Sequence, residues 1–288
     1  MLIKNGEEKV MELKITTLIE NNPDDLGQLL YEHGLSLYIE TDGKNILFDT
    51  GKSGDFIKNA RSLNKNLENL DYCIISHGHY DHSGGVENFI SEVKKSPEFI
   101  VGEEFFNPKY KIVDATNYKF NGNSFDEEFI VKKQISLRKV REDMVYLTDH
   151  IILFHHFLQS NEFEKRSDRF YRKENNAYIQ DDFDDEISLG VITKKGLVVI
   201  AGCSHVGIIN ILKTVSERVN IPIYAVIGGT HLIEADETRI QKTLDAFREM
   251  KIQLIAVSHC TGEEGIRLIR EEQKEQFLFN NTGKVIEI

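Results

Sequence analysis

Four short apolar runs, each ending in small residues and followed by a histidine, constrain the fold of this chain more than any other feature. They are Tyr72–Ser76 before His77, Leu197–Ala201 before His205, Ile223–Ile227 before His231 and Leu254–Val257 before His259. A helical pattern follows each run, at 85–93, 206–219, 235–250 and 264–272. Strands that alternate with helices predict a mixed α/β fold. Because ligands bind at the carboxyl ends of strands in open α/β sheets, we expect these histidines to meet in space.

The rest of the chain fits one large domain. Strand patterns at 13–19, 35–40 and 45–48 and a helical pattern at 53–63 precede the first histidine run. Residues 1–10 are polar and patternless, and we interpret them as an N-terminal extension to a single domain at 11–288. The interval 103–180 holds 14 of the 27 Phe and Tyr residues, which favours an insertion that covers the site or packs on itself.

Composition narrows the classes of function and partner. The chain has 35 Lys and Arg against 47 Asp and Glu, and a formal net charge of -12 disfavours nucleic acid as the main partner. No apolar run reaches the roughly 20 residues that span a bilayer, so we expect no membrane segment and a cytoplasmic location. The three cysteines are far apart in sequence, and we expect them to be reduced.

The clearest motif is the hexapeptide 77–82, His-Gly-His-Tyr-Asp-His, directly after a predicted strand. In extended chain, residues two apart project to the same side, so His77 and His79 can bind one ion together. Asp81 and His82 then lie where the chain turns into a helix, and they can face a second ion. Imidazoles with one carboxylate suit zinc, iron or manganese. The motif therefore predicts a metal centre, most simply with zinc.

The motif resembles that of the metallo-β-lactamase superfamily, whose hallmark is H-x-H-x-D-H after a strand. Residues 45–51 are similar to the superfamily's first motif, which implies that Asp49 orients the metal-binding loop through hydrogen bonds. The segment 257–262 is similar to its last motif, which implies that His259 binds the second metal. The segments 202–205, 228–232 and 259–262 also resemble a subgroup named after dihydropterin-ribofuranosylaminobenzene-phosphate synthase. The resemblance implies a four-layer αββα sandwich with two metal ions.

This resemblance gives an expected ligand set for two divalent cations. One ion would take His77, His79 and His205, and the other would take Asp81, His82 and His259. Asp81 and Asp49 are the expected catalytic carboxylates, with Asp49 acting through its hydrogen bonds. Cys203 stands where many superfamily hydrolases carry a bridging Asp, so it either bridges the metals as a thiolate or is a small buried thiol. His155 and His156 are a weaker choice than His205, and we interpret them as ordinary residues of the insertion.

Two segments are candidates for binding an anionic substrate. The turn Gly229-Thr230-His231 precedes a helix and can present backbone N–H groups and an imidazole to an anion, or His231 can fix a neighbouring loop. Arg166 and Arg169 belong to the basic run 165–173, which can anchor a negative group. The acidic run 181–186 lies close by, and mutual pairing on a solvated face is our default interpretation.

The expected function is that of a dinuclear metal-dependent hydrolase, in which metal-bound hydroxide attacks an ester or phosphoester of a small anionic substrate. An alternative is a synthase that joins an aromatic amine to a pterin-like ring. A di-iron redox protein is a further alternative, although relatives of that type commonly replace the second histidine of the motif by Glu.

Overall fold

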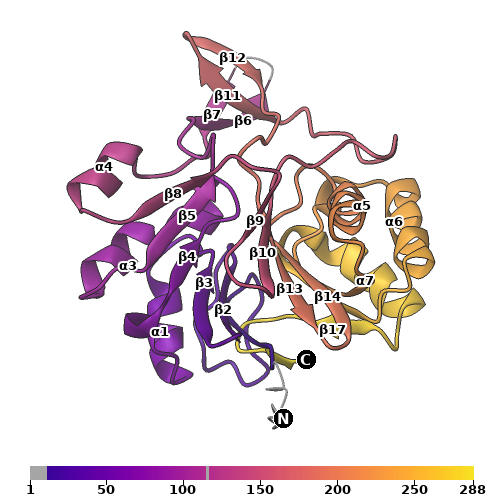
Figure 1. The fold of residues 1–288 in the computed structure, drawn as a ribbon. Coiled ribbons are helices and arrows are strands. Elements are labelled where there is room, and N and C mark those ends of the chain that lie inside the picture. Colours follow the sequence, from indigo (N-terminus) through magenta and orange to yellow (C-terminus); the bar gives the residue numbers. More distant parts are fainter. Residues whose placement is uncertain (1–11, 115–116) are drawn as a thin grey trace, which may run out of the picture.

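The computed structural model describes residues 12–114 and 117–288, so the predicted extension at 1–10 lies outside the described residues. Two seven-stranded sheets form the centre of the molecule (Figure 1). In spatial order, the first sheet consists of β18 (Val285–Glu287), β1 (Lys14–Ile19), β2 (Ser36–Thr41), β3 (Lys44–Phe48), β4 (Tyr72–Ile74), β5 (Glu98–Gly102) and β8 (Leu137–Val140). Its strands β3, β4, β5 and β8 are parallel.

The second sheet contains three of the four predicted histidine strands. In spatial order it consists of β17 (Phe277–Phe279), β16 (Leu254–Val257), β15 (Ile223–Gly228), β14 (Gly196–Ala201), β13 (Ser188–Thr193), β10 (Ile151–Phe154) and β9 (Met144–Tyr146). The parallel register aligns Ala201 with Gly228, and Gly228 with Val257. Because these strands end at one level, the loops that carry the three histidines leave the same edge of the sheet.

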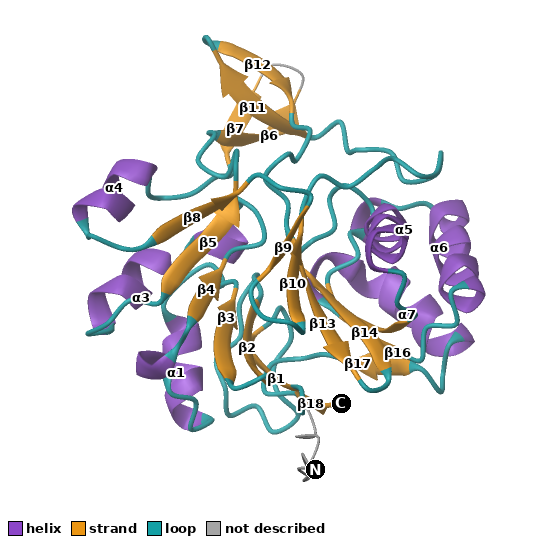
Figure 2. Cartoon of the chain, viewed as in Figure 1, coloured by secondary structure: helices purple, strands orange, loops and turns teal. Residues whose placement is uncertain are grey.

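Three apolar clusters hold the layers together. One fills the space between the two sheets, with Ile46 and Ile200 among its members. A second lies between the first sheet and the helices α1 (Asp55–Ser62), α3 (Val86–Glu92) and α4 (Glu127–Lys132). The third lies between the second sheet and α5 (Ile208–Val219), α6 (Glu237–Glu249) and α7 (Gly262–Glu272). The helices cover the outer faces of the paired sheets, as Figure 2 shows, and this confirms the predicted αββα sandwich.

A third, four-stranded sheet stands beside the sandwich. Its order is β12 (Ala177–Gln180), β11 (Phe170–Glu174), β6 (Lys109–Asp114) and β7 (Asn117–Phe120). The aromatic-rich interval 103–180 is therefore divided, because its segments β8, β9 and β10 complete the two main sheets. The apolar side chains of β10 are fully buried between these layers, which explains why that part is not an added lobe. Within the described residues, no helix is long and apolar enough to cross a membrane.

Candidate metal centre

The first sheet supplies the hexapeptide. After β4 the chain continues in extended form, and His79, with φ -88° and ψ 146°, precedes the short helix α2 (Tyr80–Ser83). The extended backbone places His77 Nε2 3.1 Å from His79 Nδ1. All four candidate metal ligands of the hexapeptide are buried, and Asp81 has the largest exposed fraction, 7%. The local geometry thus agrees with the alternation expected from the sequence.

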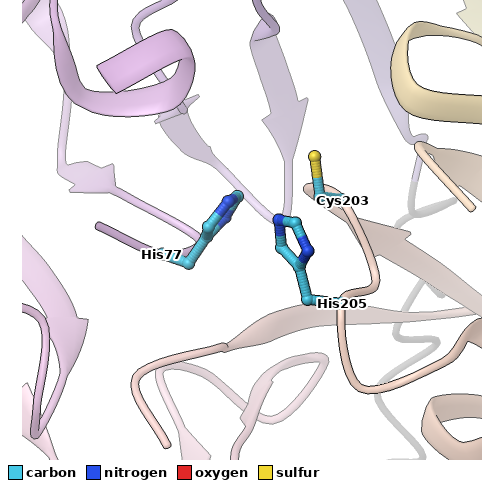
Figure 3. A group of neighbouring side chains, drawn as sticks. All are labelled: His77, Cys203 and His205. Carbon is cyan, nitrogen blue, oxygen red and sulfur yellow. The ribbon is translucent and has the colours of Figure 1, made fainter. Parts of the chain in front are cut away.

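The second sheet brings His205 against these two imidazoles. The ring centroid of His205 lies 4.8 Å from that of His77 and 4.7 Å from that of His79. The rings of His77 and His205 converge from opposite sheets in Figure 3. The ring of Phe183 stacks on that of His205 at 4.1 Å, with an angle of 3° between the two planes. Three imidazoles from two sheets therefore form one buried group.

A second group lies beside the first. His82 Nε2 is 3.1 Å from His259 Nε2, and Asp81 Oδ2 lies 3.5 Å from His259 Nε2 and 3.9 Å from His82 Nε2. His259 belongs to the 3₁₀-helix η3 (His259–Thr261), which follows β16. The structure thus places the six predicted ligands in two adjacent groups of three.

Cys203 lies between the two groups. Its Sγ atom is 3.2 Å from His82 Nε2, and it forms close sets of candidate ligands both with His77 and His205 and with His82 and His259. In each set the ligand atoms lie within 4.8 Å of one another. A third such set joins Cys203 to His231 and Cys260. The sulfur is therefore within reach of both groups of histidines.

Asp49 lies beneath the hexapeptide and is fully buried. Its carboxylate accepts hydrogen bonds from Ser76 N at 2.7 Å and Ser76 Oγ at 2.9 Å, and it lies 2.6 Å from His82 Nδ1. This contact directs the Nε2 atom of His82 towards His259. Gly202 permits the close approach, because a Cβ atom there would lie 2.1 Å from Ser76 Oγ.

Burial and neighbouring charges set the protonation of the donors. Burial lowers the pKa of His77, His79 and His205 well below the ordinary value, so these imidazoles are neutral. For Asp81, burial raises the pKa, but the hydrogen bond from His33 and the nearby histidines outweigh burial and hold the pKa well below the ordinary value. Neutral imidazoles and an ionised carboxylate are the forms that bind metal cations.

Three residues in the N-terminal part of the chain contact the candidate metal ligands and were not predicted from the sequence. Glu20 and Asn21 directly follow β1: Glu20 accepts the backbone N–H of His259 at 2.6 Å, and Asn21 Oδ1 lies 2.9 Å from His259 Nδ1. His33, half-exposed, lies 3.2 Å from Asp81 Oδ2. Glu20 and Asn21 could have been predicted from the sequence, because they are polar residues directly after a strand. His33 follows no strand, so no comparable sequence signal pointed to it.

The acidic run 181–186 corrects the expectation of a solvated face. Asp181, Asp185 and Glu186 are buried. Lys109 Nζ lies 2.7 Å from Asp181 and 2.8 Å from Asp185, and Asp185 also accepts the N–H of Gly78 inside the hexapeptide at 2.7 Å. The run is buried because its carboxylates have partners in the site itself, in addition to the basic run nearby.

Glu186 holds the His205 loop of the second sheet, as Asp185 holds the hexapeptide of the first sheet. Its two oxygens accept the backbone N–H groups of His205 and Val206, each at 2.9 Å. Burial raises the pKa of Glu186 to about 7, although these two hydrogen bonds act in the opposite direction. Because Asp185 and Glu186 are consecutive, one short segment fixes both the hexapeptide and the His205 loop.

The turn 229–231 departs from the expected anion site. The N–H of Gly229 donates to Gly202 O at 2.9 Å, and the N–H of Thr230 donates to Thr261 Oγ1 at 3.3 Å. Because both amides already have partners inside the protein, they are not available to an anion. His231, however, does face the centre, with its ring 4.3 Å from that of His205 and its Nε2 3.5 Å from Glu234.

The two arginines and the remaining histidines lie around the site. Arg166 pairs with Asp182, and Arg169 pairs with Glu234 at 2.8 Å. His155 Nε2 lies 2.6 Å from the backbone oxygen of Asp184, whereas the exposed His156 pairs with Asp143. Neither His155 nor His156 belongs to the groups of candidate metal ligands found among residues 12–114 and 117–288.

Comparisons with known proteins agree with this geometry. The family model of the metallo-beta-lactamase superfamily matches residues 31–120. The chain is 32% identical over 308 residues to the 7,8-dihydropterin-6-methyl-4-(beta-D-ribofuranosyl)-aminobenzene-5'-phosphate synthase of Methanocaldococcus jannaschii, covering 99% of each chain. It is also 30% identical over 260 residues to an uncharacterized protein of the same archaeon, covering 89% of this chain and 94% of that one.

A solved structure gives the same result. A protein described as a metal-dependent hydrolase of the beta-lactamase superfamily superimposes with a TM-score of 0.83 at 30% identity, covering 96% of this chain and 99% of that chain. The chain therefore belongs to the metallo-β-lactamase superfamily, and within it to the group related to the dihydropterin-ribofuranosylaminobenzene-phosphate synthase.

Proposed function

We propose that this chain is a metal-dependent hydrolase that holds two divalent cations between its sheets and cleaves an ester or phosphoester of a small anionic substrate. The observation that supports this most directly is the meeting of two buried groups of three donors each. The first group is His77, His79 and His205, and the second is Asp81, His82 and His259.

The donors themselves fit cations. Among the described residues, neither ring nitrogen of His205 has a hydrogen-bond partner. His79 Nε2 is also buried without one among these residues. Leaving a buried polar atom without a partner costs about 1–3 kcal/mol, a cost that bound cations would remove. Cys203 adds a sulfur within reach of both groups, and a soft sulfur beside imidazoles favours zinc over magnesium or calcium.

Two such ions, when bound, would polarise the group that reacts and lower the pKa of water towards neutrality. The protein's own residues hold and shield that chemistry. Asp49 and Asn21 fix the orientation of His82 and His259 through their Nδ1 atoms, which directs the Nε2 atoms into the centre. Phe183 covers one face of the His205 ring. The half-exposed His33 can pass a proton between solvent and the Asp81 side of the centre.

A synthase that joins an aromatic amine to a pterin-like ring is the second candidate. The full-length similarity to a protein of that name favours it. The second archaeal relative is uncharacterized and favours neither reaction. A solved structure that is 30% identical over 96% of this chain is described as a metal-dependent hydrolase. For this reason we place hydrolysis first.

The test uses the purified chain loaded with zinc. We expect it to hydrolyse at least one member of a panel of 4-nitrophenyl phosphoesters, lactones and thioesters. His79→Ala and Asp81→Ala should abolish turnover and lose metal while the far-UV circular dichroism stays that of the wild type. A zinc-loaded wild type that hydrolyses nothing, but condenses an aromatic amine with a pterin-type electrophile, would replace the hydrolase with the synthase.

A further inference from the structure

A cavity of about 650 Å³ opens beside the metal centre, between the β6–β7 hairpin and the hexapeptide. Its size is typical of sites for small molecules, which span about 300–1,000 Å³. Tyr80, which stands between His79 and Asp81 in the motif, forms part of the wall, and its N–H donates to Asn121 O at 3.1 Å. The other lining residues include Lys111, Lys119, Phe120, Asn121 and Arg169.

The register of the small sheet shows which way the lysines face. Lys111 lies directly opposite Lys119 on one side and Phe170 on the other. Residues directly opposite in an antiparallel sheet project to the same face. The Phe170 ring lies 5.1 Å from that of His79 and 5.0 Å from that of His205, and Lys111 Nζ lies 5.7 Å from the Phe170 ring. Both lysines therefore project from the face of the sheet that covers the metal centre.

The two like charges lie opposite each other, with Lys111 partly buried and Lys119 exposed. Like charges directly opposite in a sheet destabilise it. In the part of the chain that the structure describes, no carboxylate lies within ion-pair distance of Lys111 or Lys119, although the chain as a whole carries a net charge of -12. The neighbouring Lys109 has two carboxylate partners and Arg169 has one. A dianion between Lys111 and Lys119 would convert the repulsion into attraction.

We propose that this cavity binds a phosphate monoester group of the substrate, distinct from the bond that reacts. This inference rests on the proposed function, because it places the reacting part of the same molecule beyond Phe170, at the metal donors. A phosphate monoester carries nearly two charges at neutral pH, which matches the two ammonium groups of Lys111 and Lys119. The substrate class is thus a small phosphorylated molecule whose phosphate serves as an anchor.

The test measures binding of ribose 5-phosphate to the zinc-loaded chain by isothermal titration, with ribose and inorganic phosphate as comparisons. The double variant Lys111→Gln/Lys119→Gln should bind ribose 5-phosphate on the order of 100-fold more weakly, about tenfold for each charge-assisted contact. Lys111→Arg/Lys119→Arg should restore most of the affinity. The matched control is Lys194→Gln/Lys195→Gln, two exposed lysines in the turn between β13 and β14, and it should bind as the wild type does.

The outcomes separate this inference from the proposed function. Lysine-dependent binding in a chain that shows no hydrolysis supports the cavity and overturns the hydrolase. Equal affinity of wild type and the Gln double variant overturns the cavity, even where hydrolysis is observed. Weaker binding that is accompanied by loss of zinc or of thermal stability, and is not restored by the Arg variant, also overturns it, because the lysines would then be structural. Binding of inorganic phosphate that equals binding of ribose 5-phosphate and ignores the lysines assigns the anion to the metals and overturns the cavity.

Discussion

At the scale of single residues, the site depends on buried charges whose partners come from distant parts of the chain. Lys109 is 2% exposed and lies between Asp181 and Asp185, and Asp185 in turn holds the hexapeptide through Gly78. A charge in this position is stabilised only while its partners remain. The cluster therefore couples the four-stranded sheet to the metal-binding loop.

Replacing Lys109 by Met should destabilise the protein strongly. The variant leaves two buried carboxylates without their cation, and breaking a buried ion pair in this way costs about 3–5 kcal/mol. The free energy of unfolding in urea measures it. Lys194→Met, at an exposed site, is the control and should stay within about 0.5 kcal/mol of the wild type. A loss below about 1 kcal/mol for Lys109→Met would show that the cluster contributes little.

The pH dependence of that difference follows from the pKa of Lys109. Burial lowers this pKa, but Asp185 and Asp181 outweigh burial and raise it above the ordinary value of 10.5. A group whose pKa is higher in the folded than in the unfolded state contributes its full stabilisation at a pH below the unfolded pKa. That stabilisation is lost as the pH rises through the folded pKa. The difference in unfolding free energy between wild type and Lys109→Met should thus stay constant from pH 7 to about pH 10 and shrink at higher pH. A difference that grows above pH 10 would contradict this assignment.

Asp49 offers a test of how the ligands are oriented. Asp49→Asn preserves the shape but replaces one carboxylate oxygen by an amide, which cannot accept from both Ser76 and His82 as the carboxylate does. We expect zinc affinity to fall about 10–100-fold, the usual effect of removing a group that orients a ligand. Competition with a coloured chelator measures the affinity, and circular dichroism checks the fold. Unchanged affinity would mean that Asp49 serves the fold alone.

The candidate metal ligands could be predicted from the sequence, because their spacing within the hexapeptide and their positions after strands indicate a shared site. The hexapeptide and the histidines after the strands of the second sheet come together as expected. Asp185 and Glu186 were assigned to a solvated face, because a run of acidic residues normally pairs with solvent or with a basic run. Only the folded chain shows that Lys109, some 70 residues earlier in the sequence, neutralises this run.

At the scale of elements, the strands before the histidines were predicted within a residue or two. Runs such as 197–201 are continuously apolar because both faces of the strand are covered, and the structure buries these side chains completely. The four-stranded sheet was not predicted as a sheet. Lysines and tyrosines alternate along it, and its outer aromatics, such as Tyr118 and Tyr178 with rings 3.9 Å apart, pack on one another away from the main core. Such a pattern does not distinguish a sheet from a lobe of loops.

The helix after His205 has an unusual N-terminus that can be tested. The Glu164 carboxylate accepts the N–H groups of Ile209 and Asn210, each at 2.8 Å, in the first turn of α5. Glu164→Ala should cost about 1–3 kcal/mol in urea unfolding, because two buried N–H groups lose their acceptor. Glu164→Gln should lose less. The exposed Glu162→Ala is the control. Equal stability of Glu164→Ala and the control would exclude a capping role.

At the scale of the whole molecule, the candidate centre is the place where the two sheets meet. Strands from both sheets end at the same edge, so residues separated by up to 182 positions, from His77 to His259, share one buried space. Cations bound there would link the two sheets. We expect zinc at 100 times its dissociation constant to raise the melting temperature by about 4–5 °C per site over the chelator-treated protein. A melting temperature that does not respond to zinc would contradict a centre shared by the sheets.

Elemental analysis of the zinc-saturated chain and of two variants tests the central claim most directly. His205→Ala removes a donor from the first group, and His259→Ala removes one from the second. We predict two divalent ions per chain in the wild type and a loss of about one ion in each variant, with the fold retained. A wild type that binds no metal, or variants that both keep two ions, would contradict the account.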